Sequence, residues 1–131
     1  MPNLIDSAFV KYGTIPGNAG GFDWDARAIS NGATQYSDAI PNWLFDGTCS
    51  LLSILTSADD ITLTYECSDD NVNWYTPYDT SGTNLGVIMT NQTATRWFAF
   101  GFPVARYIRF KVVANADSVV TLKLFKREVF A

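Results

Sequence analysis

Histidine is absent from the 131 residues of this sequence, and cysteine occurs only twice. Without histidine the chain lacks the commonest general base, the base of Ser/His and Cys/His nucleophile systems and the commonest transition-metal ligand. Two well-separated cysteines, Cys49 and Cys67, do not make a zinc site, which uses four ligands. We therefore expect no enzyme activity and no cofactor.

Paired carboxylates are the one acid–base alternative that this composition leaves. A glycosidase needs two carboxyl groups facing each other across a cleft. The closely spaced pairs are Asp23/Asp25, Asp59/Asp60 and Asp69/Asp70. Short acidic side chains in turns usually bond their own backbone, so we interpret these pairs as capping and turn residues.

Charged residues are scarce at 17% of the chain, against roughly 25% on average, whereas aromatic residues reach 15%. Residues 1–80 hold two basic and eleven acidic side chains, and residues 81–131 hold seven basic and two acidic ones. Either the folded sheets mix the two halves, or a basic surface on one subunit meets an acidic surface on its neighbour. The net charge of −4 argues against nucleic acid as the partner, since phosphate contacts need clustered lysine and arginine.

Long apolar runs are also missing, and the longest fall far short of the roughly 20 residues that span a bilayer. The first residues, Met1 to Asp6, lack the basic start and apolar stretch of a signal peptide. We therefore expect synthesis in a reducing cytoplasm and no membrane insertion. There, Cys49 and Cys67 are expected as buried free thiols, although two cysteines also allow one disulfide.

What the sequence does contain is alternation of apolar and polar residues, which predicts half-buried strands. One run spans residues 106–113 and another spans residues 61–67. The inward sets are Ile108, Phe110 and Val112 in the first run, and Ile61, Leu63, Tyr65 and Cys67 in the second. Arg106 falls on the inward side of its run, so it would need a carboxylate or carbonyl partner.

Short polar connections follow both runs and predict hairpins. Residues 115–118 would join the 106–113 run to a returning strand over residues 120–124. Residues 68–71 would join the 61–67 run to a returning strand that starts at Val72.

The whole pattern predicts an all-β fold, a jelly-roll-like antiparallel β-sandwich of about seven or eight strands. Residues 1–22 are expected to form an extended N-terminal arm, because glycine and proline break this stretch repeatedly. Residues 23–131 are expected to form a single β-sandwich domain. Such an arm either lies over its own domain or reaches a neighbouring subunit.

Two segments resemble a known family. Residues 62–74 carry a strand, the turn Ser68-Asp69-Asp70-Asn71 and then Trp74, similar to a hairpin of discoidin-like domains (the coagulation-factor type C, galactose-binding-like sandwich). Residues 102–110 contain Ala-Arg-Tyr-Ile-Arg, which resembles another strand of that family, and residues 122–125 stand where its closing strand would be. The resemblance covers residues 61–125 and implies the sandwich fold.

The same two motifs also resemble those of small virion proteins of tailed phages, which decorate capsids or tails with β-sandwich modules. From this resemblance we expect a non-enzymatic virion structural protein, made in the host cytoplasm and located in the virion. It would be a capsid decoration or head/tail accessory protein. Its partners would be further copies of itself and a major capsid or tail protein.

Contact residues for such an assembly are expected in the region that one sandwich core explains least. They are Phe9, Tyr12, Phe22, Trp24, Trp43 and Phe45. The arm would then act as a tether between subunits.

Two ligand sites are weaker alternatives. Asp69, Asp70 and Asn71 could offer oxygen ligands to calcium, although no twelve-residue calcium loop is present. Trp74, Tyr75 and Tyr78 could form a glycan platform, which would make the chain a carbohydrate-binding module for receptor or glycan attachment. A discoidin-like adhesion domain that binds a lipid or cell surface is a third hypothesis.

Overall fold

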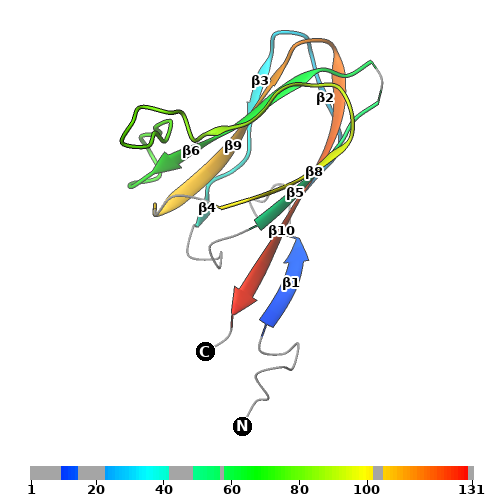
Figure 1. Cartoon of the computed structure of the whole chain (residues 1–131). Helices are drawn as coiled ribbons and strands as arrows, with labels where there is room; N and C mark the ends of the chain where they lie inside the picture. The colour runs from blue at the N-terminus through cyan, green and yellow to red at the C-terminus, as the bar shows by residue number, and fades with distance from the viewer. Residues whose placement is uncertain (1–9, 15–22, 42–48, 57, 102–104, 130–131) are drawn as a thin grey trace.

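Ten strands make up the computed structural model, which describes residues 10–14, 23–41, 49–56, 58–101 and 105–129 (Figure 1). For residues 10–14, 23, 49, 100 and 126–129 it describes the backbone alone. The strands are β1 (Val10–Thr14), β2 (Asp23–Ile29), β3 (Thr34–Tyr36), β4 (Ile40–Pro41), β5 (Cys49–Ile54), β6 (Ile61–Ser68), β7 (Val87–Gln92), β8 (Arg96–Phe100), β9 (Tyr107–Ala114) and β10 (Ser118–Val129). No helix occurs in these ranges, and so none that could cross a bilayer.

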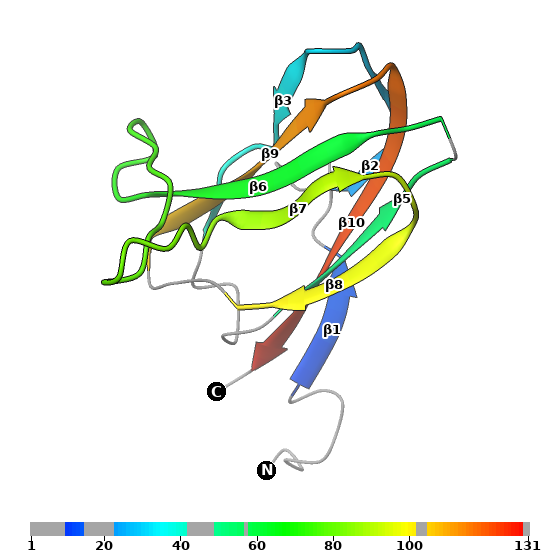
Figure 2. The same ribbon diagram turned by 45° about the horizontal axis from the view of Figure 1, so that its top comes forward.

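The strands form two antiparallel sheets that pack face to face (Figure 2). We call them the β10 sheet and the β9 sheet after their central strands. In the β10 sheet the order is β2-β10-β5-β8, and β1 continues the line of β2 along β10. In the β9 sheet the order is β3-β9-β6-β7, and β4 continues the line of β3. The chain passes repeatedly from one sheet to the other, which is a jelly-roll arrangement. The predicted all-β sandwich is therefore confirmed.

The core lies between the sheets and comes from the inward positions of alternating strands. Strand β9 alternates partly exposed and buried residues along its whole length, and β6 does so from Ile61 to Tyr65. The fully buried side chains of the two central strands are Ile108, Phe110, Val112, Val120, Leu122 and Leu124. The inward positions expected for Ile61, Leu63 and Tyr65, and for Ile108, Phe110 and Val112, are therefore confirmed.

Of the two predicted hairpins, the one that joins the 106–113 run to residues 120–124 is wrong, and the one after residue 67 is present only as a short antiparallel bridge. Strand β9 pairs with β3, β4 and β6, whereas β10 pairs with β1, β2 and β5, so the turn at residues 115–117 crosses between the sheets. Residues after the 68–71 turn return only as an isolated bridge between Cys67 and Tyr75. A short turn between two alternating runs fits a hairpin and a sheet-to-sheet crossing equally well, because each run needs only one buried face.

Hydrogen bonds between buried polar groups connect the two sheets. Ser53 of β5 donates its hydroxyl to the side-chain oxygen of Gln92 of β7 at 3.0 Å, and both residues are buried. Asp59, which is 4% exposed, accepts hydrogen bonds from the backbone N–H groups of Thr56 at 2.6 Å and Val119 at 3.0 Å. These bonds satisfy groups that would be costly to bury alone.

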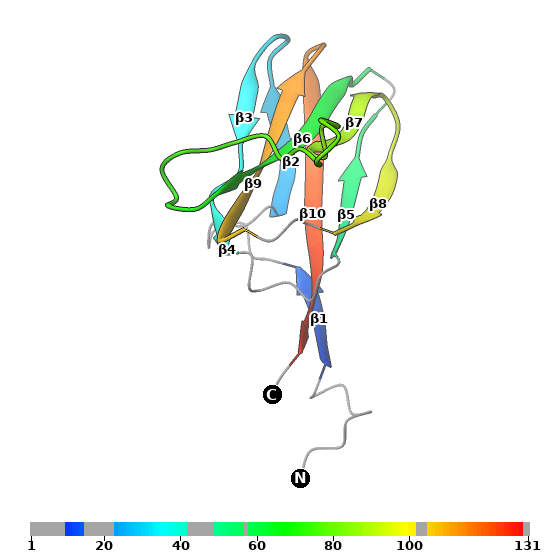
Figure 3. The same ribbon diagram turned by 60° about the vertical axis from the view of Figure 1, so that its left-hand side comes forward.

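Two strands continue past the sandwich. The pairing of β10 with β5 ends at Lys126, whereas its pairing with β1 continues to Val129 opposite Val10. The β1–β10 ribbon therefore extends beyond the body of both sheets, as Figures 1 and 3 show. The three residues after Lys126 correspond to about 10 Å of ribbon.

Candidate interaction surface

The outer face of the β9 sheet is polar and centres on Arg109. The Arg109 guanidinium lies 2.8 Å from a carboxylate oxygen of Glu66, its partner in the neighbouring strand. It also lies over the ring of Tyr36 at 4.0 Å and over the ring of Trp74 at 4.5 Å from the ring centroids. The Arg109 and Glu66 side chains are only 23% and 17% exposed. One cation is thus enclosed by one anion and two aromatic rings.

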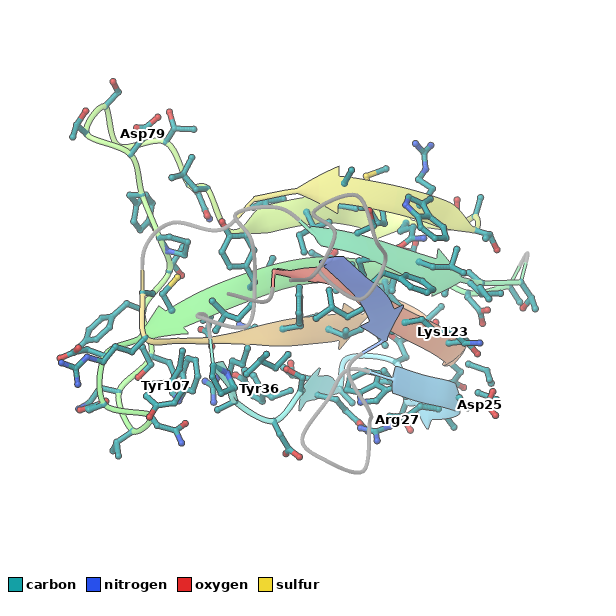
Figure 4. The ribbon with its side chains drawn as sticks, turned by 90° about the horizontal axis from the view of Figure 1, so that it is seen from below. Asp25, Arg27, Tyr36, Asp79, Tyr107 and Lys123 are labelled. Atoms are coloured by element: carbon teal, nitrogen blue, oxygen red, sulfur yellow. The ribbon has the colours of Figure 1, made fainter. Side chains whose placement is uncertain are left out.

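Sequence alternation explains this cluster. Arg109 and Glu66 stand on the outward sets of β9 and β6 and face each other in the sheet register. Tyr36 of β3 stands opposite Lys111, one outward position along β9 from Arg109. Seen from below, Tyr36 and Tyr107 lie on the same side of the molecule, and Asp79 marks the tip of a loop that projects from the sheets (Figure 4).

The outer face of the β10 sheet is apolar at its β8 side. The rings of Trp97 and Phe125 stack at 5.0 Å with an interplanar angle of 16°, although β5 lies between their strands. Trp97 nevertheless remains 57% exposed. We call the following set the apolar patch: Trp97, Phe125, Leu52, Ile54 and Ala99.

A groove adjoins the apolar patch where the edges of the two sheets meet. Its cavity volume is about 300 Å³. We call it the apolar groove, and it is lined by Tyr65, Leu85, Val87, Ile88, Trp97 and Phe98, among others. Leu85, Val87 and Trp97 are 42%, 46% and 57% exposed, so the groove opens to the surface.

The segment from Leu85 to Val87 is held in place by backbone bonds on both sides of Gly86. The Leu85 N–H donates to the Pro77 carbonyl, and the Tyr65 N–H donates to the Gly86 carbonyl, each at 2.8 Å. A Cβ on Gly86 would lie 2.6 Å from the Tyr65 carbonyl oxygen, so only glycine fits this approach. The groove wall is therefore fixed by a close contact with β6.

The aromatic residues proposed as a glycan platform separate in the structure. Trp74 is half-buried and stacks on Arg109, whereas Tyr75 lines a shallow hollow of about 220 Å³ with Cys67 and Arg106. Tyr78 is 60% exposed and bridges Asn84 in the projecting loop. Trp74 and Tyr75 are consecutive in an extended segment and contact different surroundings, so the structure does not join the three rings into one platform.

The turn proposed for calcium uses its oxygens for internal bonds. One Asp70 carboxylate oxygen accepts the backbone N–H groups of Val72 and Asn73, and the other accepts the Asn73 side-chain amide. The Asn73 and then the Val72 N–H hold the pKa of Asp70 well below its usual range. Asp69 pairs with Arg106 at 3.2 Å, and Asn71 adopts a positive φ of 61°.

Calcium would thus compete with bonds that already shape the turn. In the described part of the chain, no group of three or more histidine, cysteine, aspartate or glutamate side chains could hold a metal. The acidic residues of this turn are explained by bonds within and beside the turn, which agrees with the interpretation of Asp69 and Asp70 as turn residues.

Arg106 has the expected carboxylate partner in Asp69, but its predicted inward position is wrong. Its side chain is 75% exposed, because β9 begins at Tyr107 and Arg106 precedes the strand. Cys67 is a free thiol, as expected, but it is only partly buried, where it packs against the core. Its pKa is raised first by burial and then by the nearby Glu66 carboxylate. The side chain of Cys49 lies outside the described residues.

Burial corrects one of the expected contact residues. Trp24 is only 4% exposed and belongs to the core, with the Arg27 guanidinium over its ring at 4.1 Å. It faces inward because it stands opposite the buried Leu122 in the sheet register. Tyr12 lies in β1, where the backbone alone is described. The other four, Phe9, Phe22, Trp43 and Phe45, lie outside the described residues.

Sequence reasoning did not single out Trp97 as a contact residue. In the run Arg96–Phe100 both alternating sets are apolar, Trp97 and Ala99 on one side and Phe98 and Phe100 on the other. Alternation alone therefore leaves the inward side open. The scarcity of charge in this run is the signal that could have marked Trp97 as a candidate contact residue.

No protein-family model matches the chain, and no curated protein sequence matches it, so the discoidin-like resemblance stays a resemblance of motifs. The fold is similar to that in the crystal structure of the SPBc2 prophage-derived protein YomS. The TM-score is 0.50, the sequence identity is 12%, and the similarity covers 91% of this chain and 93% of that one. At this identity the likeness establishes a shared fold across nearly the full length of both chains.

Proposed function

We propose that this chain is a non-enzymatic structural protein of a tailed-phage virion, a capsid decoration or head/tail accessory protein. One observation carries the proposal: a prophage-derived protein has the same fold over 93% of its length. Jelly rolls are also common in viral capsid proteins. The proposed location is the virion, after synthesis in the host cytoplasm.

The surface chemistry supports a docking role. The apolar patch and the apolar groove share Trp97, which leaves aromatic and aliphatic area exposed on one side of the molecule. Exposed contiguous apolar surface of this kind marks interaction sites. The proposed partners are other copies of this chain and a major capsid or tail protein, which would cover this side and keep the polar β9 face in solvent.

Purified particles provide the test. In lysates of the strain that encodes the chain, antibodies against the recombinant protein are expected to detect it in the particle band of a density gradient. A Trp97→Lys variant, introduced in place of the wild-type gene, should stay folded but be absent from the particle band, because a charge on the apolar patch opposes burial. Protein found only in the particle-free fraction of the wild type would overturn the proposal.

A carbohydrate-binding module is the second candidate, and a polar hollow on the β9 side favours it. The hollow is about 180 Å³ and is lined by Thr64, Glu66, Thr76, Asn84 and Lys111, among others. Hydroxyl, carboxylate, amide and ammonium groups together offer both donors and acceptors to sugar hydroxyls. A glycan array would identify a ligand, and Lys111→Ala should then weaken its binding. No signal on an array with correctly folded protein would remove this candidate.

A further inference from the structure

The apolar groove lies between two strand edges that have no partner in the described part of the chain. Among the described strands, β7 ends the β9 sheet and pairs only with β6, and β8 ends the β10 sheet and pairs only with β5. Such edges present backbone N–H and C=O groups that an added strand can bind. A groove lined by apolar side chains, with polar backbone groups beside them, fits an extended segment that carries apolar side chains.

Strand β1 shows where such a segment starts. Val10 begins β1 and stands opposite Val129 at the far end of the ribbon, past the last β10–β5 pair at Lys126. The residues before Val10 are therefore attached to the outer tip of the ribbon (Figure 3). From this tip the chain runs through β1 toward the sandwich. The segment before Val10 is therefore attached to the end of the β1–β10 ribbon that points away from the sandwich.

That segment has the right length and composition for the groove. At least nine residues precede Val10, and fully extended they reach about 30 Å. Leu4, Ile5, Ala8 and Phe9 are apolar. As a strand, the segment would place Ile5 and Phe9 on one face. One aromatic and one aliphatic side chain four residues apart suit a groove walled by Trp97, Leu85 and Val87.

We propose that residues 1–9 of one copy of this chain add as a strand at the apolar groove of a second copy, between β7 and β8. The inference deepens the proposed function and rests on it, because it names the contact through which copies assemble. Exchange of the same segment in both directions gives a closed dimer, and exchange in one direction gives a ring or a row of subunits.

A second copy accounts for the geometry better than the chain's own groove does. To reach its own groove, the segment would have to reverse at the ribbon tip and return over about 10 Å, which uses several of its nine residues in a turn. A neighbouring subunit facing the tip receives the segment without that turn. Exchange of a terminal segment between copies is a common low-cost route to oligomers.

The first experiment measures molar mass by size-exclusion chromatography with light scattering. The full chain is expected as a dimer or larger oligomer, and a chain lacking residues 1–9 as a folded monomer by circular dichroism. Trp97→Lys in the full chain should weaken self-association at least about tenfold, since it places a charge in the groove. Val72→Lys serves as the matched control, because Val72 is 75% exposed in the distant 68–73 turn.

The decisive experiment mixes two deficient chains. The chain lacking residues 1–9 has a groove but not the inserting segment, and the full-length Trp97→Lys chain has the segment but a blocked groove. At a protein concentration where each chain alone is monomeric, the mixture should form a heterodimer. No complex in the mixture would overturn the inference, as would a truncated chain with the mass of the full chain.

Two further outcomes are informative. A full chain that is monomeric at every concentration, but less stable after truncation, would place the arm on its own groove and overturn exchange between copies. Particles that still retain the truncated, monomeric protein would show that arm exchange is dispensable for incorporation, while the proposed virion function stands.

Discussion

The outer faces of the two sheets are built by the same alternation but differ in how their side chains are satisfied. On the β9 sheet, Arg109 finds its carboxylate in Glu66 and its ring partners in Tyr36 and Trp74 within the same chain. On the β10 sheet, Trp97 stacks on Phe125 and still leaves 57% of its surface exposed. The Arg109 cluster has its charge paired within the single subunit, whereas the apolar patch leaves the Trp97 ring largely exposed to solvent.

From this difference we expect the two faces to contribute differently to the stability of the subunit and to its association with a partner. A partly buried ion pair with its hydrogen bonds resists loss of either partner, because the remaining charge is left without compensation. Exposed aromatic area adds little to the stability of the subunit but gains when a partner removes it from water. Substitutions on the β9 face should thus affect unfolding, and substitutions on the apolar patch should affect association.

The largest expected effect comes from Arg109→Ala. It removes the charged hydrogen bond to Glu66 and both ring contacts, and we expect the free energy of unfolding to fall by on the order of 3 kcal/mol. Trp97→Thr, on the other face, should cost only about 1 kcal/mol for the lost stack on Phe125. Urea unfolding of both variants, at concentrations where the chain is monomeric, measures the contrast.

Arg109→Lys sharpens the same comparison. Lysine keeps the charge but cannot stack its head group on two rings as a planar guanidinium does. An intermediate loss of stability is expected. Equal losses for Arg109→Ala and Trp97→Thr would contradict the division between the two faces.

The next effect concerns Asp59, which joins the turn before β6 to Val119 of β10 and so fixes the two sheets relative to each other. Burial raises the pKa of Asp59. The hydrogen bonds from the N–H groups of Thr56 and Val119 and from the Thr56 hydroxyl together lower it by more, so the net shift of the pKa is downward. A carboxylate with a lowered pKa in the folded state stabilises the protein above its unfolded pKa near 4. That contribution is lost as the pH falls through the folded value.

Asp59→Asn should therefore cost about 2 kcal/mol at pH 7, because an amide replaces an ionised acceptor. The difference from wild type should shrink as the pH falls below about 4, since wild type itself then loses its carboxylate. Urea unfolding at pH 7 and pH 3 measures both values. A difference that stays constant with pH would show that the ionised form of Asp59 contributes nothing.

The strands of the core could be predicted from the sequence, but their partners could not. Alternation in residues 61–65 and 106–113 identifies the buried set because burial of a strand depends on its own residues. The polar stretch at residues 115–118 predicts a hairpin, yet the chain crosses between the sheets there. Which sheet receives the next strand depends on side chains far away in the sequence, and a turn of three residues is compatible with both paths.

The position of the candidate interaction surface could not be predicted from the sequence. The surplus of aromatic residues indicated docking, but Trp24 proved to be core and Trp97 proved to be exposed. Trp97 lies in a run where apolar residues occupy both sides of the strand. Trp24 instead alternates with Asp23, Asp25 and Arg27, a pattern that is typical of the inward position it takes in the structure. The Arg109 and Glu66 pair could not be found either, because it depends on the register between β9 and β6, and the register is set by the whole sheet.

The smallest expected effect is on the reactivity of Cys67, at the end of the β9 sheet where Tyr75 bridges β6. Each backbone N–H of this pair donates to the carbonyl of the other at 2.9 Å, and Tyr75 lines the hollow beside the thiol. Because the raised pKa reduces the thiolate fraction, a thiol reagent at pH 8 should react several-fold more slowly with the folded protein than with the protein in urea. Cys49→Ser makes Cys67 the only thiol. Adding Tyr75→Ala should speed the folded reaction without changing stability much, whereas equal rates in folded and unfolded protein would mean that the β9 face is open at this end.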